Sequence, residues 1–269
     1  MGPMRANKRY GQHFLQGAWA DKLVTAIAPA PDDWFLEIGP GPGALTLRLA
    51  RYVAHLTAVE VDPEMVSELR PRLPGNVDLV QQDFLNFDLG SLAADTGGGL
   101  RIAGNLPYNA ASPILIKLLA ARRSGVRLSD ATLMLQREVA DRIEGQPGTK
   151  AFGTLSIFTQ LRADVRRLMT LPPGAFRPTP KVHSAVLRLE FREPSVSLIH
   201  EPTFEALVRS IFTQRRKTLA NALRPFAEAR GIDPRDAIAR AALDGTRRPE
   251  ALQITDLARL ADVFTSQVS

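Results

Sequence analysis

The chain has 269 residues, a formal net charge of +6 at pH 7 and no cysteine. The length accommodates one large domain or a medium and a small one, and the charge suits either a nucleic-acid partner or simply a basic soluble enzyme. The absence of cysteine excludes disulfides, thiolate metal sites and reactions that need a cysteine nucleophile.

The first two thirds of the chain alternates short apolar runs with helical periods. After a basic arm at residues 1–16 and a helix at 18–27, strands are predicted at 34–38, 56–61, 77–81, 100–103 and 131–135. The helices predicted between them cover 44–52, a segment from Asp62 and Pro63 onward, 113–121 and 138–143. This alternation predicts a parallel sheet that is covered on both faces.

The pattern changes toward the C-terminus. Beyond a loop at 145–150, two further strands are predicted at 165–169 and 185–191, the second as an antiparallel edge. Only helical periods follow, at 204–212, 216–223, 234–242 and 255–264. We therefore expect an α/β, Rossmann-like domain at 1–194 and a small all-α domain at 195–269.

A glycine-rich segment follows the first strand. Gly39, Gly41 and Gly43 open a helix there, so the backbone can approach a ligand closely at a helix N-terminus. Glu60 ends the next strand, where a carboxylate can accept hydrogen bonds from both hydroxyls of a ribose. These residues predict a site for an adenosine-bearing cofactor.

Residues 39–44 also satisfy the dinucleotide fingerprint, so a nicotinamide oxidoreductase remains an alternative. Three features favour a methyl donor instead. Glu37 is unfavourable beside a pyrophosphate but favourable beside a cationic amino-acid group. Asp83 ends the third strand, where it can accept from an adenine amine, and the motif at 105–108 has no evident role in hydride transfer.

That motif, Asn105-Leu106-Pro107-Tyr108, ends the fourth strand and can hold an amino group attached to an aromatic ring. The side-chain carbonyl of Asn105 and the backbone carbonyl of Leu106, presented by the rigid Pro107 turn, can accept from both N–H groups of adenine. Tyr108 offers a face for stacking a base taken out of its helix, and Phe176 either stacks on the other face or packs in a loop core. Because Asn105 is neutral, it would act by positioning and not as a base.

The densest basic run is Arg215-Arg216-Lys217, in the predicted helical domain. Three consecutive cations spread over about 200° of a helix, so they do not form one narrow stripe. Either some of them contact RNA phosphates while another packs internally, or the run is a solvated face.

Together these segments make the chain resemble the small-subunit ribosomal RNA adenine dimethyltransferase family over nearly its whole length. The resemblance rests on motifs at residues 9–15, 37–46, 60, 82–83, 105–109, 135–140, 176–189, 214–219 and 248–250. It implies a class I methyltransferase sheet in which S-adenosylmethionine donates methyl groups, twice each, to two adjacent adenosines near the 3′ end of small-subunit (16S) rRNA. It also implies the assembling small ribosomal subunit as the partner.

Carried over by motif, the cofactor contacts implied by the resemblance are His13, Leu15, Gly39, Glu60, Asp83 and Asn105. His13 departs from the family, which usually has Asn there, so this contact either depends on pH or uses the backbone. The alternatives are a macrolide-resistance type of large-subunit rRNA methyltransferase and a non-catalytic ribosome assembly factor. Gly11 and the full helical domain with residues 248–250 favour the small-subunit group.

No segment reaches the roughly 18 apolar residues of a membrane span, and the basic N-terminus lacks the apolar run of a secretion signal. None of the four histidines forms a metal-ligand pair at helical spacing. We expect a cytoplasmic, monomeric protein without a metal or a membrane partner.

Overall fold

The computed structural model describes residues 12–97, 99–107 and 110–265. The chain divides into two compact units: unit 1 comprises Met1–Ala140 and Asp164–Phe191, and unit 2 comprises Asp141–Ala163 and Arg192–Ser269. Unit 2 therefore contains a segment that the sequence pattern placed in the α/β domain. The physical reason is apolar packing, because Phe152, Ile157 and Leu161 are buried in the same core as Phe204 and Leu207.

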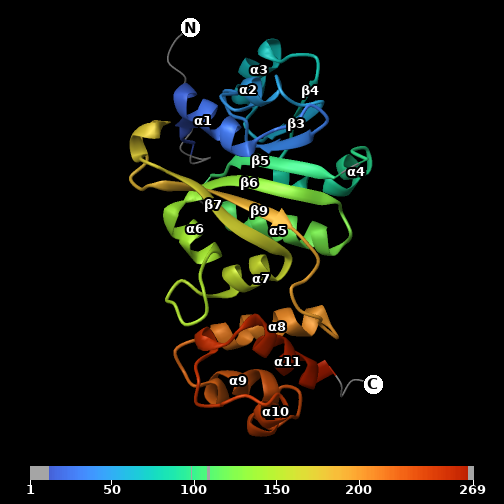
Figure 1. Ribbon diagram of the computed structural model, residues 1–269, viewed down its shortest axis with the longest axis vertical. Coiled ribbons are helices and arrows are strands. Elements are labelled where there is room, and N and C mark those ends of the chain that lie inside the picture. The colour runs from blue at the N-terminus through green and yellow to red at the C-terminus, as the bar shows by residue number, and fades with distance from the viewer. Residues whose placement is uncertain (1–11, 98, 108–109, 266–269) are drawn as a thin grey trace. The chain divides into compact units, whose positions relative to one another are not determined.

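Unit 1 is built on a seven-stranded sheet in the order β4-β3-β2-β5-β6-β9-β7 (Figure 1). Its strands are β2 (Trp34–Ile38), β3 (His55–Glu60), β4 (Val77–Gln81), β5 (Leu100–Asn105), β6 (Leu128–Gln136), β7 (Ala163–Leu171) and β9 (Ser184–Phe191). The strands from β4 to β6 are parallel, whereas β9 runs antiparallel to β6. The expected mostly parallel sheet with an antiparallel strand is confirmed, although β9 is not itself the edge, because β7 adds outside it.

The central strands β2, β3 and β5 are almost entirely buried, because the sheet is flanked by helices. These helices are α1 (Gly17–Ile27), α2 (Thr46–Leu49), α3 (Pro63–Leu69), α4 (Leu89–Ala94), α5 (Ala111–Arg123) and α6 (Arg137–Ile143), whose last residues belong to unit 2. The Asp62 side chain accepts from the Glu64 amide at 3.0 Å, which confirms the predicted start of α3. Helix α2 is shorter than expected because turns occupy residues 41–45.

A two-stranded antiparallel ribbon completes unit 1. It joins β1 (Phe14–Leu15) to β8 (Phe176–Arg177), with Leu15 opposite Phe176. Neither strand was predicted, because two residues are too short for a periodic signal.

A buried cluster of charges lies where β5, β6 and β9 meet. The Arg101 guanidinium donates to both carboxylate oxygens of Asp130 at 2.9 Å and to Asp33 at 2.5 Å. The Arg188 Nε lies 3.4 Å from Asp130. The Asp130 side chain is only 11% exposed, so it neutralises two cations that have little access to water.

We expect Asp130→Ala to lower the free energy of unfolding by about 3 kcal/mol, because it leaves two buried guanidinium groups without their shared anion. Urea denaturation measures the effect. Asp21→Ala is the matched control, since Asp21 pairs with Arg48 at 2.5 Å but is 65% exposed. Its loss should cost less than about 1 kcal/mol. Equal effects for both variants would contradict a stabilising role for the cluster.

Unit 2 is helical. Its helices are α7 (Thr154–Arg162), α8 (Glu201–Phe212), α9 (Leu219–Glu228), α10 (Pro234–Arg240) and α11 (Ile254–Thr265). Helix α9 begins three residues later than expected, because the amides of Leu219 and Ala220 donate to the carbonyls of Arg247 and Gly245. The basic run Arg215-Arg216-Lys217 consequently lies in the turn before α9 and not on a helix. Among the described residues, every helix is too short or too polar to span a bilayer.

Candidate active site

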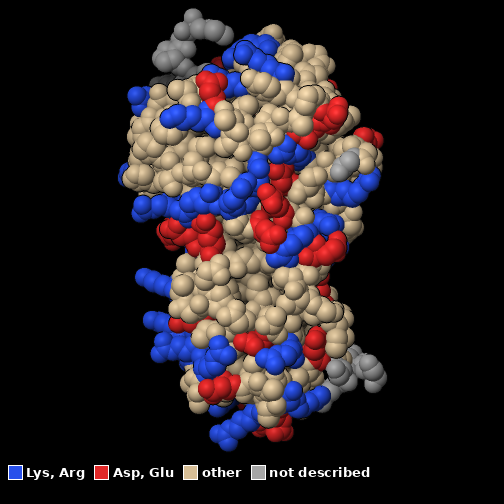
Figure 2. All heavy atoms as spheres, in the orientation of Figure 1, with Lys and Arg blue, Asp and Glu red and all other residues tan. Residues whose placement is uncertain are grey.

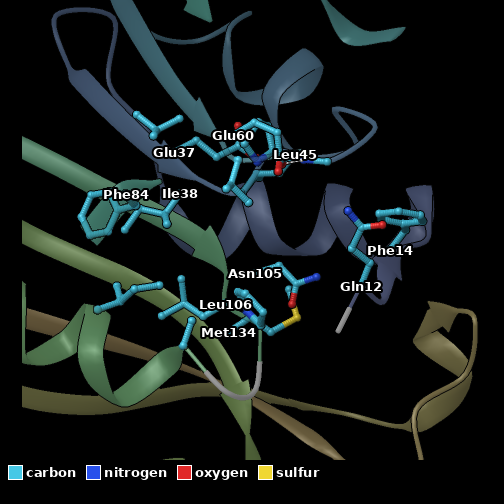
Figure 3. Close-up of a pocket in the computed structure, with 18 of the residues that line it drawn as sticks. Gln12, Phe14, Glu37, Ile38, Leu45, Glu60, Phe84, Asn105, Leu106 and Met134 are labelled. Atoms are coloured by element: carbon cyan, nitrogen blue, oxygen red, sulfur yellow. Dashed lines mark hydrogen bonds between the residues drawn. The ribbon is translucent and has the colours of Figure 1, made fainter. Parts of the chain in front are cut away.

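A pocket of about 290 Å³ opens at the carboxyl ends of β2, β3 and β5 (Figure 3). Ligands of open α/β sheets bind at this edge. The sequence-predicted residues that line the pocket are His13, Leu15, Glu37, Gly39, Gly41, Glu60, Asp83, Asn105, Leu106 and Pro107. Figure 3 shows Glu37 and Glu60 on one side of the pocket and Asn105 and Leu106 on the other. Residues from separate strand ends therefore line one cavity.

The glycine-rich turn needs its glycines. Gly39 and Gly41 have φ values of +68° and +50°, in the left-handed region that side chains rarely adopt. A Cβ at Gly41 would also lie 3.2 Å from the Phe14 ring. The turn therefore keeps its backbone at the wall of the pocket, with the Phe14 ring beside it.

Glu60 fixes this turn. One carboxylate oxygen accepts from the Gly41 amide and the other from the Asp62 amide, both at 2.9 Å. Burial raises the pKa of Glu60, and these backbone hydrogen bonds oppose the rise. Each carboxylate oxygen has a second lone pair, so the same group can also accept from hydroxyls of a ligand.

Glu37 is the most unusual group in the pocket. Its side chain is 2% exposed, and its Oε2 atom has no hydrogen-bond partner among the described residues. Burial raises the pKa of Glu37 to about 8, and the nearby charge of Glu60 adds to the rise. Burial makes the ionised form of this carboxyl costly, so a cationic group that enters the pocket would favour its ionisation and be stabilised by it.

Asn105 has a defined orientation. Its Nδ2 donates to the backbone carbonyl of His13 at 2.8 Å, which leaves the side-chain oxygen as the acceptor of the amide. The preceding Gly104 allows β5 to lie close to β2, since a Cβ there would be 2.8 Å from the Ile38 carbonyl oxygen. Local backbone packing thus determines where the amide is placed.

Backbone hydrogen bonds hold the two residues after Asn105. The Leu106 amide donates to the Met134 carbonyl at 3.1 Å, and the Pro107 carbonyl accepts from the amides of Ala110 and Ala111. Leu106 is 1% exposed, so its backbone is firmly placed. Tyr108, the expected stacking residue, lies outside the described residues.

His13 contributes through its backbone. Its carbonyl holds Asn105, while the ring Nδ1 lies 2.8 Å from the Pro178 carbonyl and must donate to it. The sequence left open whether His13 acts through its ring or its backbone. In the structure the His13 backbone accepts from the Asn105 amide, and the ring ties this segment to residue 178.

The end of the pocket near β4 is formed by a short turn. The Asp83 carboxylate accepts from the Leu85 amide at 2.9 Å and begins the 3₁₀ turn η3 (Phe84–Asn86). Val61 and Leu85 line the same pocket and are 40% and 41% exposed, so two apolar side chains stand open beside a carboxylate.

Sequence reasoning did not identify most of the apolar lining. The missed residues include Phe14, Ile38, Leu45, Val61, Phe84, Leu85, Ile114 and Met134, together with Gln12. Several of them directly follow or precede a polar residue at a strand end, which is the signal that could have identified them.

The expectation that Phe176 offers a face for stacking a base is wrong for this structure. Phe176 is 1% exposed, packs within the core of unit 1 and does not line the pocket. Its pairing with Leu15 in the β1–β8 ribbon explains this burial. The loop-core alternative describes its position.

The three residues of the basic run differ in their surroundings. The Arg215 guanidinium donates to the carbonyls of Lys150 and Phe152 at 3.0 and 3.4 Å and lies 3.8 Å from the Glu250 carboxylate, all within unit 2. Arg216 and Lys217 are exposed. Figure 2 shows that basic side chains are interspersed with acidic ones over the helical unit.

Comparison with known proteins gives consistent matches. The family model for "Ribosomal RNA adenine dimethylase" matches residues 4–257. A protein of Acidithiobacillus ferrooxidans named "Ribosomal RNA small subunit methyltransferase A" is 41% identical over 269 residues, covering 99% of this chain and 97% of that protein. A relative of the same name from Xylella fastidiosa is 38% identical over 261 residues, covering 96% and 95%.

Solved structures support the fold. A dimethyladenosine transferase from Plasmodium falciparum has a TM-score of 0.75 and 24% identity, and the match covers 92% of this chain and 96% of that one. The 23S rRNA methyltransferase ErmE has a TM-score of 0.70 and 26% identity, with coverage of 94% and 99%. The reversed strand β9 also departs from the dinucleotide-binding order 3-2-1-4-5-6. The oxidoreductase alternative is therefore not favoured, and this chain belongs to the ribosomal RNA adenine dimethylase family.

Proposed function

We propose that this protein transfers methyl groups from S-adenosylmethionine to N6 of two adjacent adenosines near the 3′ end of small-subunit rRNA. Its substrate would be the assembling small ribosomal subunit, and it would act as a monomer in the cytoplasm. The observation that carries the proposal is that Asn105 and Leu106 share one pocket with Glu37 and Glu60. Relatives that are about 40% identical over nearly the full length bear the name of a small-subunit rRNA methyltransferase.

The described residues fit this cofactor. Glu37 has an unpartnered buried oxygen for the cationic amino-acid group, and Glu60 can accept from ribose hydroxyls. Asp83 lines the same pocket as the apolar residues Val61 and Leu85 and would accept from the adenine amine. When bound, S-adenosylmethionine supplies a methyl group on a positively charged sulfur.

At the reaction end an N–CH3 bond would form as the S–CH3 bond breaks, and the proton lost from N6 would pass to solvent, because Asn105 and the Leu106 carbonyl are not bases. The amine of adenine is a poor nucleophile, because its lone pair is delocalised into the ring. The Asn105 side-chain oxygen and the Leu106 carbonyl would accept its two N–H groups and leave the lone pair directed toward the methyl group. His13 keeps the Asn105 amide in the required orientation. The contribution to the rate is positioning by fixed dipoles.

Transfer of labelled methyl groups to small subunits from cells that lack this protein tests the proposal. Mapping of modified nucleotides should place dimethyladenosine at two adjacent positions near the 3′ end. Large-subunit rRNA serves as the second substrate, and its preferential methylation would favour the macrolide-resistance type. Cofactor binding without transfer to either RNA would favour the assembly factor. Calorimetry should show binding of S-adenosylmethionine and none of NAD.

Arg216 and Lys217 are the residues of the basic run that we assign to phosphate contacts. Replacing both with alanine should reduce the slope of log K against log salt for RNA binding by about 1.5, because two counterions fewer are released. Arg235→Ala with Arg240→Ala removes the same charge from exposed positions of α10 and is the matched control. If the salt slope of the Arg216 and Lys217 double variant equals that of the wild type, these two residues do not contact the RNA.

Arg215→Ala has a different expected outcome. The Arg215 guanidinium donates hydrogen bonds to the carbonyls of Lys150 and Phe152. Its removal should therefore lower the melting temperature of unit 2 more than it changes the salt dependence of RNA binding. Thermal unfolding and the same salt titration separate the two effects.

A further inference from the structure

Lys117 lies on α5, on the same side of the helix as Ala110 and Ile114, which line the pocket. Its ammonium donates to the carbonyls of Leu85 and Phe87 at 2.8 and 2.6 Å. The same nitrogen lies 5.2 Å from the centroid of the Phe84 ring. A single side chain therefore joins α5 to the segment 84–87 by two hydrogen bonds and a cation–π contact.

This segment forms one end of the pocket. Asp83, Phe84 and Leu85 all line it, and the Asp83 carboxylate caps the turn. The other hydrogen bonds described for residues 84–87 are local, such as the Asn86 amide to the Asp83 carbonyl and the Gln82 side chain to the Asn86 carbonyl. The contact with Lys117 is what ties the turn to a long helix.

The charge of Lys117 also acts on the turn. Burial lowers the pKa of Lys117, while the negative charges of Asp83 and Asp88 oppose that change. The ammonium thus stands in the field of the same carboxylate that faces the pocket. Removing it would release two carbonyls and alter the position of Asp83 at once.

We propose that Lys117 is a positioning residue that holds Asp83 and Leu85 in place for the adenine of the cofactor. The inference rests on the proposed function, because it takes the adenine to be bound at this end. Lys117 does not line the pocket. Its effect is therefore on recognition of the base and not on the methyl-transfer step.

The test compares two ligands that differ only at the amine. S-adenosylhomocysteine carries the adenine amine, and its purine-riboside analogue carries a hydrogen atom in place of the amine. The wild-type protein should bind the first about 10- to 100-fold more tightly, because Asp83 accepts a hydrogen bond from the amine. In Lys117→Met this ratio should fall to about threefold or less, with a raised KM for the cofactor and a nearly unchanged kcat.

Three variants complete the design. Lys22→Met is the matched control, since Lys22 is exposed and lies over the Trp19 ring at 4.4 Å in the same unit; its ratio should equal that of the wild type. Lys117→Arg keeps the charge and should retain most of the ratio. Lys117→Gln replaces Lys117→Met if the latter does not fold, and should also lower the ratio.

The outcomes distinguish this inference from the function on which it rests. A wild-type ratio in both neutral variants of Lys117 overturns the positioning role and leaves the proposed function intact. A fall in melting temperature with an unchanged ratio shows a purely structural role and also overturns the inference. Failure of the wild-type protein to bind S-adenosylhomocysteine overturns both.

Discussion

Replacing Asn105 with alanine should reduce kcat for methyl transfer by about 10²- to 10³-fold. In the proposed mechanism the side-chain oxygen of Asn105 is one of two acceptors that orient the amine, and alanine supplies none. Cofactor binding should weaken by less than about tenfold, because at most one neutral hydrogen bond is lost there. Single-turnover kinetics and calorimetry with S-adenosylhomocysteine measure the two effects separately.

Two further variants sharpen this result. Asn105→Asp keeps an oxygen acceptor but cannot donate to the His13 carbonyl, so the orientation is lost and the rate should also fall. Asn76→Ala is the matched control, because the Asn76 amide donates to the carbonyls of Ala50 and Val53 away from the pocket. It should lower stability and leave kcat unchanged. Normal transfer by Asn105→Ala would show that the mechanism is wrong.

Binding of the cofactor should depend on pH through Glu37. Burial raises the pKa of Glu37 to about 8, so at pH 7 the carboxyl of the free protein is mostly protonated. A cationic ammonium beside it favours the ionised form, and binding then releases a proton. If only the ionised form binds, affinity should rise about 20-fold from pH 6.5 to pH 8.5.

Calorimetry in buffers of different ionisation enthalpy measures the released proton. Glu37→Gln should bind weakly with little pH dependence, and a desamino analogue of the cofactor should release no proton from the wild-type protein. The free energy of unfolding of the free protein should change with pH in the opposite direction to the affinity for the cofactor. The free protein should lose stability as pH rises from about 4.5 toward 8, since the unfolded state gives up the Glu37 proton first. Equal affinity at both pH values would exclude Glu37 as the partner of the ammonium.

Much of the site could be predicted from the sequence, because strand ends are visible in the hydrophobic pattern. Glu37, Glu60 and Asn105 each end an apolar run, and parallel strands bring such ends to one edge. The hydrophobic pattern does not show which polar atoms of a residue already have a hydrogen-bond partner within the protein. Only the structure reveals that His13 acts through its carbonyl and that Arg215 is bonded to carbonyls within its own unit.

Long-range pairing limited the remaining predictions. Phe176 is buried because β8 pairs with β1, more than 150 residues earlier in the chain. The segment 141–163 joins unit 2 through apolar contacts with α8, although its local sequence resembles the rest of the α/β pattern. Both features depend on partners that local propensity does not encode.

The segment just before the two-residue strand β1 has a practical consequence for studying this enzyme. Gln12 donates to Asp62 at 2.8 Å and the His13 carbonyl accepts from Asn105, so these two residues are tied to groups at and beside the pocket. Removing residues 12 and 13 would take away the backbone acceptor that orients the Asn105 amide. Preparations intended for rate measurements should therefore retain this segment.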